Sequence, residues 1–461
     1  MNNDKLYKSS GGGRAREKTS CEFRRHFHQI EIPGHLLDQL KKGNIVIFAG
    51  AGISTETRTA FAFTFYDEIR AELDLDPNNK PPFPVLMSRY CNQPDGRREL
   101  LKKLKNRFSY IAAFPQLLRA ATRFHHELST LFYIDTYITT NWDDYFERYC
   151  GATPFVSGED FAFWNIEGPK VFKVHGSVSN YGSIIATSED YRRAKTELEH
   201  GAIGSALKLL LATKTIVYVG YSLYDHDFLS IQRFITRDLR GVAPAGYVVS
   251  LDRSAEPRFR KLGLTSIFTD AAYFVHVLKK RLEKDGCLLP DSRLDRIPNI
   301  LDQVNIEHKR LFDHFKLAQT PEILFAAAYQ DGLAHAFERM LAMAHTGQYS
   351  NPCELVNQLR KYMKIQKDNL RARRYDDVAY IEGYSNGLIY LLDDDKGRNR
   401  IPIYFGFGMP DIRTLRDYKA ALTKNRYRHK ASLSRAKTII DKMNLGPKDV
   451  LHHIPFIDWE D

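Results

Sequence analysis

The stretch from residue 44 to residue 54 places the firmest constraint on the fold. It reads Asn-Ile-Val-Ile-Phe-Ala-Gly-Ala-Gly-Ile-Ser, an apolar run of strand character that ends in Gly50-Ala51-Gly52, and a helical pattern follows within a few residues. This order is typical of a loop that receives a phosphate, because glycine lets the backbone approach a ligand and a helix N-terminus offers free N–H groups. The third glycine of the dinucleotide fingerprint is missing. A tight turn without a ligand is therefore the competing interpretation.

Length and composition narrow the class of protein. The 461 residues predict two or three domains. No apolar run is long enough to span a bilayer, and the polar start has no secretory core, so we expect a cytoplasmic protein without a membrane segment. The five cysteines are scattered and form no Cys-x-x-Cys pair, which argues against a disulfide framework and against a zinc ribbon. The net charge of +11 permits an anionic partner or simply a solubilising surface.

Changes in composition and in hydrophobic pattern along the chain predict the domain organisation. Residues 1–28 are basic and glycine-rich and predict a disordered arm. Residues 36–285 predict the main domain, in which residues 58–73 read as an amphipathic helix and residues 76–130 as a helical insertion. A linker is expected from Pro290 to Pro298. Residues 291–461 then predict a mostly helical domain with one strand-like run at 401–407.

Short apolar runs that alternate with helical stretches indicate an α/β fold with a doubly wound parallel sheet. The expected strands after the opening one are Ile134–Thr139, Val171–Val174, Thr215–Val219, Tyr247–Leu251 and Tyr273–Leu278.

Polar residues follow the carboxyl ends of these strands. Asn141 and Asp143 follow one strand, His175 follows another, and Ser222 and Asp225 follow a third. In open α/β sheets that edge is where ligands bind, so we expect these groups to share one site with the glycine turn. Each also has a plain structural interpretation, as a core histidine or as a helix-capping aspartate.

Four motifs in this order resemble the sirtuin (SIR2) domain, most closely its SIR2-like branch in bacterial anti-phage defence. The motifs are Gly50-Ala51-Gly52-Ile53-Ser54, Thr139-Thr140-Asn141-Trp142-Asp143, Val174-His175-Gly176-Ser177 and Gly220-Tyr221-Ser222-Leu223-Tyr224-Asp225, and the resemblance covers residues 36–285. The sequence departs from deacetylases of the family in two places. Residues 177–219 contain no cysteine, so the peptide-binding zinc ribbon is missing, and the loop after Ser54 matches the family only loosely.

The resemblance implies that NAD⁺ is bound and that its nicotinamide–ribose bond is broken, with NAD⁺ consumed as a substrate and no cofactor or metal required. His175 would be the base, and Asn141 would hold the ribose or the attacking water. The remaining expected NAD⁺-binding residues are Gly50, Ala51, Gly52, Ser54, Arg58, Asp143, Gly220, Ser222 and Asp225.

The leading functional hypothesis is hydrolysis of NAD⁺ to nicotinamide and ADP-ribose by a regulated effector of anti-phage defence. ADP-ribosyl transfer or deacylation on a protein acceptor, and a dinucleotide sensor without turnover, are the alternatives. The family implies a homo-oligomer and a second defence protein as regulator, either a HerA-type ATPase and translocase or an Argonaute. Nucleic acid would be contacted through that partner or through the basic stretch 424–437, for which a solvated helix face is the competing interpretation.

Overall fold

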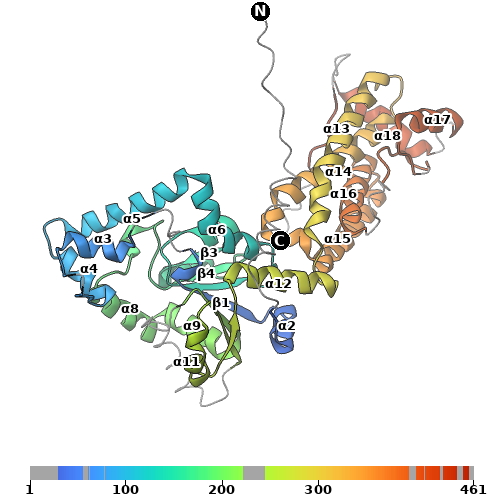
Figure 1. Ribbon diagram of the computed structural model, residues 1–461. Coiled ribbons are helices and arrows are strands. Elements are labelled where there is room, and N and C mark those ends of the chain that lie inside the picture. The colour runs from blue at the N-terminus through green and yellow to red at the C-terminus, as the bar shows by residue number, and fades with distance from the viewer. Residues whose placement is uncertain are drawn as a thin grey trace, which may run out of the picture. The chain divides into compact units, whose positions relative to one another are not determined.

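The computed structural model (Figure 1) divides the chain into two compact units, residues 1–281 and residues 282–461. The structure describes residues 30–54, 61, 63–76, 78–221, 244–393, 401–409, 411–425, 429–443 and 450–455. The predicted basic arm, residues 1–28, therefore lies outside the described residues. No helix in the described ranges is long and apolar enough to cross a membrane.

The first unit is built on a seven-stranded sheet in which every pair of neighbouring strands is parallel, with the order β3-β4-β2-β1-β5-β6-β7. The strands are β1 (Ile45–Ala49), β2 (Thr136–Thr139), β3 (Thr153–Phe155), β4 (Lys170–Lys173), β5 (Thr215–Val219), β6 (Gly246–Ser250) and β7 (Leu264–Phe268). All five residues of β1 and all five of β5 are buried, as expected for central strands covered on both faces.

Helices cover both faces of this sheet. On one face, Val46, Phe48 and Ile216 pack with apolar side chains of α9 (Ala202–Thr213) and α11 (Glu256–Lys261). On the other face, Tyr137 of β2 stacks on Phe146 of α7 (Tyr145–Cys150). The predicted doubly wound parallel sheet is confirmed.

The predicted helical insertion is present and has its own small core. It contains α4 (Phe83–Cys91), α5 (Gly96–Ala113) and α6 (Pro115–Ser129) and follows α3 (Phe65–Glu72). The helix predicted for residues 58–73 begins only at Phe65, because the Thr64 side chain caps it by accepting from the Asp67 N–H. Residues 55–60 lie outside the described residues.

One predicted strand is wrong. Tyr273–Leu278 lies within the helix α12 (Ala271–Lys284). The fully buried residues of α12 include Phe274, Val275, Leu278 and Leu282, and their spacing places them on one face of the helix. A six-residue apolar window is too short to separate this pattern from a strand. The sheet instead ends with β7, which the sequence analysis missed together with β3.

The second unit is mostly helical, as predicted. Its main helices are α13 (Ile297–His314), α14 (Ile323–Ala342), α15 (Pro352–Arg371), α16 (Tyr375–Leu392), α17 (Leu415–Asn425) and α18 (Lys430–Lys442). Helices α14 and α16 cross closely at glycines: a Cβ on Gly332 would lie 2.0 Å from the Tyr380 carbonyl oxygen. The stretch expected to be a linker forms the 3-10 helix η5 (Asp291–Arg296) and the start of α13. The strand-like run at 401–407 forms only an isolated bridge, Tyr404 to Ile412.

Candidate functional site

The site lies at the carboxyl edge of the sheet, where its topology reverses. From β1 the chain adds β2 on one side of the sheet, and it later returns to add β5 on the other side of β1. The adjacent ends of β1 and β5 are therefore the switch point at which open α/β sheets bind ligands. Thr139 of β2 is in register with Lys173 of β4, so Asn141 and His175, each two residues further on, follow neighbouring strands at the same level.

The glycine turn after β1 is interlocked with the loop after β5. The Gly50 N–H donates to the Val219 carbonyl and the Gly52 N–H to the Gly220 carbonyl, both at 2.9 Å. A Cβ on Gly52 would lie 2.8 Å from the Gly220 backbone, and Gly220 itself has φ +67°. Glycine is required here because two backbones touch. Both of these N–H groups are committed to protein acceptors in this structure.

Asn141 joins that turn to the residues after β2. Its Nδ2 donates to the Gly50 carbonyl at 3.1 Å and to the Ser54 hydroxyl at 2.8 Å. Ser54 in turn donates to Oδ2 of Asp143 at 2.8 Å. Both donors of the Asn141 amide are thus used, which leaves its Oδ1 as the acceptor that it can offer to a ligand. Since Asn141 and Asp143 are buried, the hydrogen bonds of this network fix their orientation.

A buried lysine lies behind this network. Lys173, the last residue of β4, is 1% exposed. Its ammonium group donates to the Asp143 carbonyl oxygen and forms an ion pair with Glu147 at 3.1 Å. Burial raises the pKa of the Asp143 carboxyl, and the nearby Lys173 charge opposes that rise. The pKa of Glu147 is raised by burial and opposed by Lys173 in the same way.

His175 is held by the turn that follows β4. Gly176 has φ +83°, and a Cβ there would lie 2.1 Å from the Ser183 carbonyl oxygen, so only glycine fits this turn. The His175 carbonyl accepts from the Ile185 N–H, and the imidazole is buried edge-to-face against Tyr191. The Val178 N–H donates to the Trp142 carbonyl at 2.8 Å, which ties this turn to the one that carries Asn141.

The structure brings most of the predicted residues together. Gly50, Gly52, Ser54, Asn141, Asp143 and Gly220 are joined by the contacts above, and His175 follows the neighbouring strand. Ala51 is exposed at the start of the 3-10 helix η1 (Ala51–Ile53). Arg58, Ser222 and Asp225 lie outside the described residues.

Sequence reasoning missed two members of the network, Lys173 and Glu147. The signal for Lys173 was available, because a lysine inside the short apolar run Val-Phe-Lys-Val needs a buried partner. Nothing in the sequence indicates that Glu147 is that partner. A second missed contact is the 3.1 Å hydrogen bond between the Thr140 and Tyr221 hydroxyls, which links the ends of β2 and β5.

The first unit is therefore a doubly wound α/β domain with a connected polar network at the switch point of its parallel sheet. Residues 135–274 match the family described as SIR2-like domain. The matched residues lie within the first unit, and the sequence has no cysteine between Cys150 and Cys287.

The chain also resembles three bacterial proteins, each named NAD(+) hydrolase ThsA. It is 26% identical to the protein from Enterococcus faecium over 44% of this chain and 42% of that protein. The Acinetobacter baumannii protein is 27% identical over 43% and 40%, and the Cytobacillus dafuensis protein is 28% identical over 41% and 38%. The chain thus matches about two fifths of the length of these curated relatives.

A solved structure described as "Structural Basis for the Mechanism and Regulation of Sir2 Enzymes" is also similar. The similarity has a TM-score of 0.32 and 14% sequence identity, and it covers 54% of this chain and 96% of the other.

Proposed function

We propose that this protein hydrolyses NAD⁺ to nicotinamide and ADP-ribose. The observation that carries the proposal is the network of Ser54, Asn141 and Asp143 at the sheet switch point, with His175 at the same level of the neighbouring strand. The similarity to proteins named NAD(+) hydrolase supports the choice of substrate.

The reaction breaks the bond between the nicotinamide nitrogen and the ribose anomeric carbon. The bonding electron pair leaves with nicotinamide, so no strong acid is needed, and positive charge develops on the ribose as in glycoside cleavage. Water then attacks the anomeric carbon and gives up a proton. We assign His175 as the base that accepts this proton, because an imidazole nitrogen can accept a proton from water and this ring follows the strand next to that of Asn141.

The other residues would position the substrate. Asn141 would accept a hydrogen bond from the ribose or from the attacking water through Oδ1, since its two donors are held by Gly50 and Ser54. Asp143 would act as a positioning residue, because its Oδ2 holds Ser54 and its Oδ1 accepts from the Tyr145 N–H. The turn from Gly50 to Ser54 would face the pyrophosphate, together with Arg58, Gly220, Ser222 and Asp225.

Regulation is a further part of the proposal. Free hydrolysis of NAD⁺ in the cytoplasm would deplete the cell, so an anti-phage effector of this kind must be held inactive until it is triggered. We assign the predicted helical domain, residues 291–461 of the second unit, to assembly of a homo-oligomer or to sensing through a partner such as a HerA-type translocase or an Argonaute. In α18 the basic residues Lys430, Arg435 and Lys437 are exposed, as contact with a nucleic acid would require.

The product profile tests the proposal. The purified chain, alone and with the product of a neighbouring gene, is incubated with NAD⁺ labelled in the adenine. Equal amounts of nicotinamide and free ADP-ribose are expected. Label on protein would establish transfer in place of hydrolysis, and a cyclic product would establish cyclisation. Saturable binding with intact NAD⁺ after long incubation would establish a sensor and overturn the proposal.

A further inference from the structure

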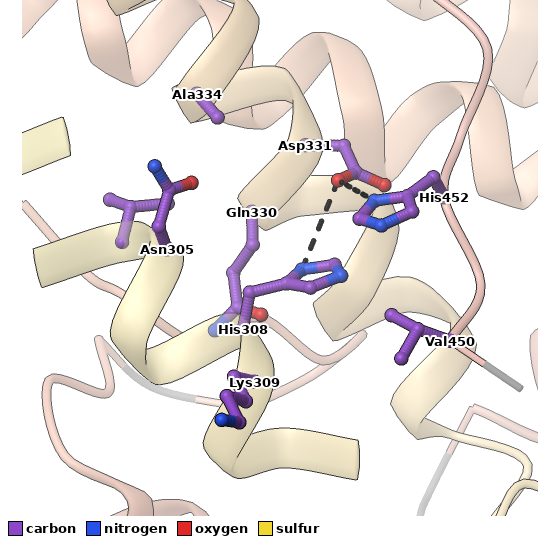
Figure 2. Close-up of a pocket in the computed structure, with 9 residues that line it drawn as sticks. Asn305, His308, Lys309, Gln330, Asp331, Ala334, Val450 and His452 are labelled. Atoms are coloured by element: carbon purple, nitrogen blue, oxygen red, sulfur yellow. Dashed lines mark hydrogen bonds and ion pairs between the residues drawn. The ribbon is translucent and has the colours of Figure 1, made fainter. Parts of the chain in front are cut away.

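The second unit contains a cavity between α13, α14 and the tail segment 450–455. Its volume is about 280 Å³, and its lining combines apolar side chains with His308, Asp331 and His452. These three residues come from α13, α14 and the tail. Figure 2 shows both imidazole rings turned toward the Asp331 carboxylate, with the cavity beside them. Segments far apart in the sequence thus bring nitrogen and oxygen donors to one point.

The donor atoms are close enough to share a ligand. Nδ1 of His452 lies 3.0 Å from Oδ1 of Asp331, and Nδ1 of His308 lies 3.8 Å from the same oxygen. A ligand atom from each of the three residues lies within 4.8 Å of the others. In a tetrahedral site with bonds of about 2.0–2.2 Å, neighbouring ligand atoms are about 3.4 Å apart. The two observed separations lie on either side of that value.

His308 is the residue that the protein alone does not explain. It is 7% exposed, and among the described residues neither ring nitrogen makes a hydrogen bond of good geometry. The groups that face it include Asp331, whose Oδ1 lies 3.8 Å from Nδ1, and Gln330. Leaving a buried polar group without a partner is costly, so such groups are uncommon and need a reason. Burial lowers the pKa of His308, and the Asp331 charge opposes that shift.

We propose that His308, Asp331 and His452 bind a divalent transition-metal ion, with Zn²⁺ as the preferred ion. Two imidazoles and one carboxylate form a donor set that suits zinc and related ions better than Ca²⁺ or Mg²⁺, which prefer oxygen ligands. The fourth position would face the cavity, where water or a small ligand can enter.

Binding requires one side chain to turn. The two rings lie nearly parallel, 8° apart in plane with centroids at 4.7 Å, and a single ion cannot lie in both planes at once. The His452 side chain is 65% exposed, so its ring can rotate toward the ion at little steric cost. His308 and Asp331 stay fixed on their helices.

A neighbouring residue orients the carboxylate. The His453 N–H donates to Oδ2 of Asp331 at 2.6 Å, which leaves Oδ1 for the ion, and the His453 ring contacts Asp377 of α16 at 3.1 Å. Hydrogen bonds of this kind orient ligands in metal sites. The ion would therefore fasten the tail to α13 and α14 and make its docking depend on metal.

The test uses the full chain after chelator treatment, titrated with Zn²⁺ and, as a spectroscopic probe, with Co²⁺. One ion per chain is expected, together with the visible absorption of a low-coordinate Co²⁺ site and a rise in melting temperature. His452→Ala and His308→Phe should weaken binding by more than about tenfold and abolish the rise in melting temperature. His345→Gln is the matched control, because His345 is exposed and the partner that the described residues offer its ring is the Ala342 backbone carbonyl.

Two outcomes would overturn the proposal. One is a parent chain that binds no stoichiometric Zn²⁺ or Co²⁺ at micromolar concentration. The other is unchanged binding in both His452→Ala and His308→Phe. Because His452 is exposed and Phe can replace the buried ring of His308, both variants should fold, and a circular dichroism spectrum of the parent type verifies this.

Discussion

Two regions of the molecule provide hydrogen-bond partners for their buried polar groups in different ways. One is the polar site at the sheet edge, and the other is the cluster of His308, Asp331 and His452 in the cavity of the second unit, here called the tail cavity. At the sheet edge Asn141, Ser54 and Asp143 bond one another, and Lys173 pairs with Glu147. In the tail cavity His308 is buried without a hydrogen-bond partner among the described residues. The first arrangement joins Ser54, Asn141 and Asp143 by hydrogen bonds and, in the described part of the chain, holds Glu147 only through its ion pair with Lys173. It can orient a substrate, whereas the second lacks a partner that a ligand can supply.

The comparison predicts opposite responses to substitution. Removing one member of a satisfied buried network leaves another group unpaired and is costly. Replacing an unpartnered imidazole by an apolar ring of similar size removes an existing cost. The following predictions run from the largest expected effect to the smallest.

Lys173→Met should produce the largest loss of stability. The methionine fills the space, but Glu147 loses its buried counter-ion, and breaking such a pair costs about 3–5 kcal/mol. Hydrogen exchange of the β2 and β4 amides measures this loss. Lys170→Met is the control. Lys170 lies on the same strand, but its ammonium group donates to the Ile166 carbonyl at the surface, so its replacement should change the stability little. Equal losses of stability in the two variants would show that the ion pair between Lys173 and Glu147 does not stabilise the fold more than the surface contact of Lys170 does.

Gly52→Ala should cost about 1–3 kcal/mol, the usual range for overpacking. Its new methyl group would lie 2.8 Å from the Gly220 backbone and push apart the loops after β1 and β5. Urea unfolding and the KM for NAD⁺ should both report the change. Gly34→Ala has open space and serves as the control. A Gly52→Ala variant as stable as Gly34→Ala would disprove the loop contact.

His125 in the first unit should make folding sensitive to acid. It is fully buried between Phe124, Tyr145 and Phe146, and burial lowers its pKa to about 3. In the unfolded chain, His125 takes up a proton as pH falls below about 6.5, whereas in the folded chain it stays neutral down to about pH 3. The stability that comes from burying the neutral ring is therefore fully present above about pH 6.5. It is lost as pH falls toward 3, by about 1.4 kcal/mol per pH unit.

His125→Phe should remove that part of the acid dependence. The control for general acid effects is His200→Phe, since His200 is exposed on α8 (Ser188–His200). Denaturation midpoints measured from pH 7 to pH 5 decide the matter. Parallel pH profiles for the parent and His125→Phe would contradict the predicted role of burial.

His308→Phe in metal-free protein should have the smallest effect, within about 1 kcal/mol of the parent and on the stabilising side. The substitution removes two unpartnered ring nitrogens and keeps an aromatic ring beside Phe312. Thermal unfolding in the presence of a chelator measures the difference in stability between this variant and the parent. A large loss of stability would show that His308 makes hydrogen bonds essential to the fold.

Much of the first unit could be predicted from sequence because its central strands are uniform apolar runs. β5 was predicted with the bounds that the structure has, and the positions of Asn141 and His175 after their strands follow from the parallel topology. The segment 273–278 could not be separated from a strand, since its helical spacing extends beyond the short apolar window. β3 was hidden by its length of three residues and by Pro154.

The interior of the site was less predictable. The pair of Lys173 and Glu147 depends on how α7 packs on the sheet, which no local pattern encodes. The cluster of the tail cavity is less visible still, because His308, Asp331 and His452 are separated by 23 and 121 residues and match no ligand spacing. Their proximity is a consequence of helix packing and tail docking in the second unit.

The rate of nicotinamide release tests the central claim most directly. It is measured for the parent chain, Asn141→Ala and His175→Ala, with the exposed residues Asn106 and His200 replaced by alanine as matched controls. The account predicts that both site variants lose at least about 10²-fold in rate while both controls keep the rate of the parent. Site variants that release nicotinamide as fast as the parent, or a parent that releases none with or without its partner, would contradict it.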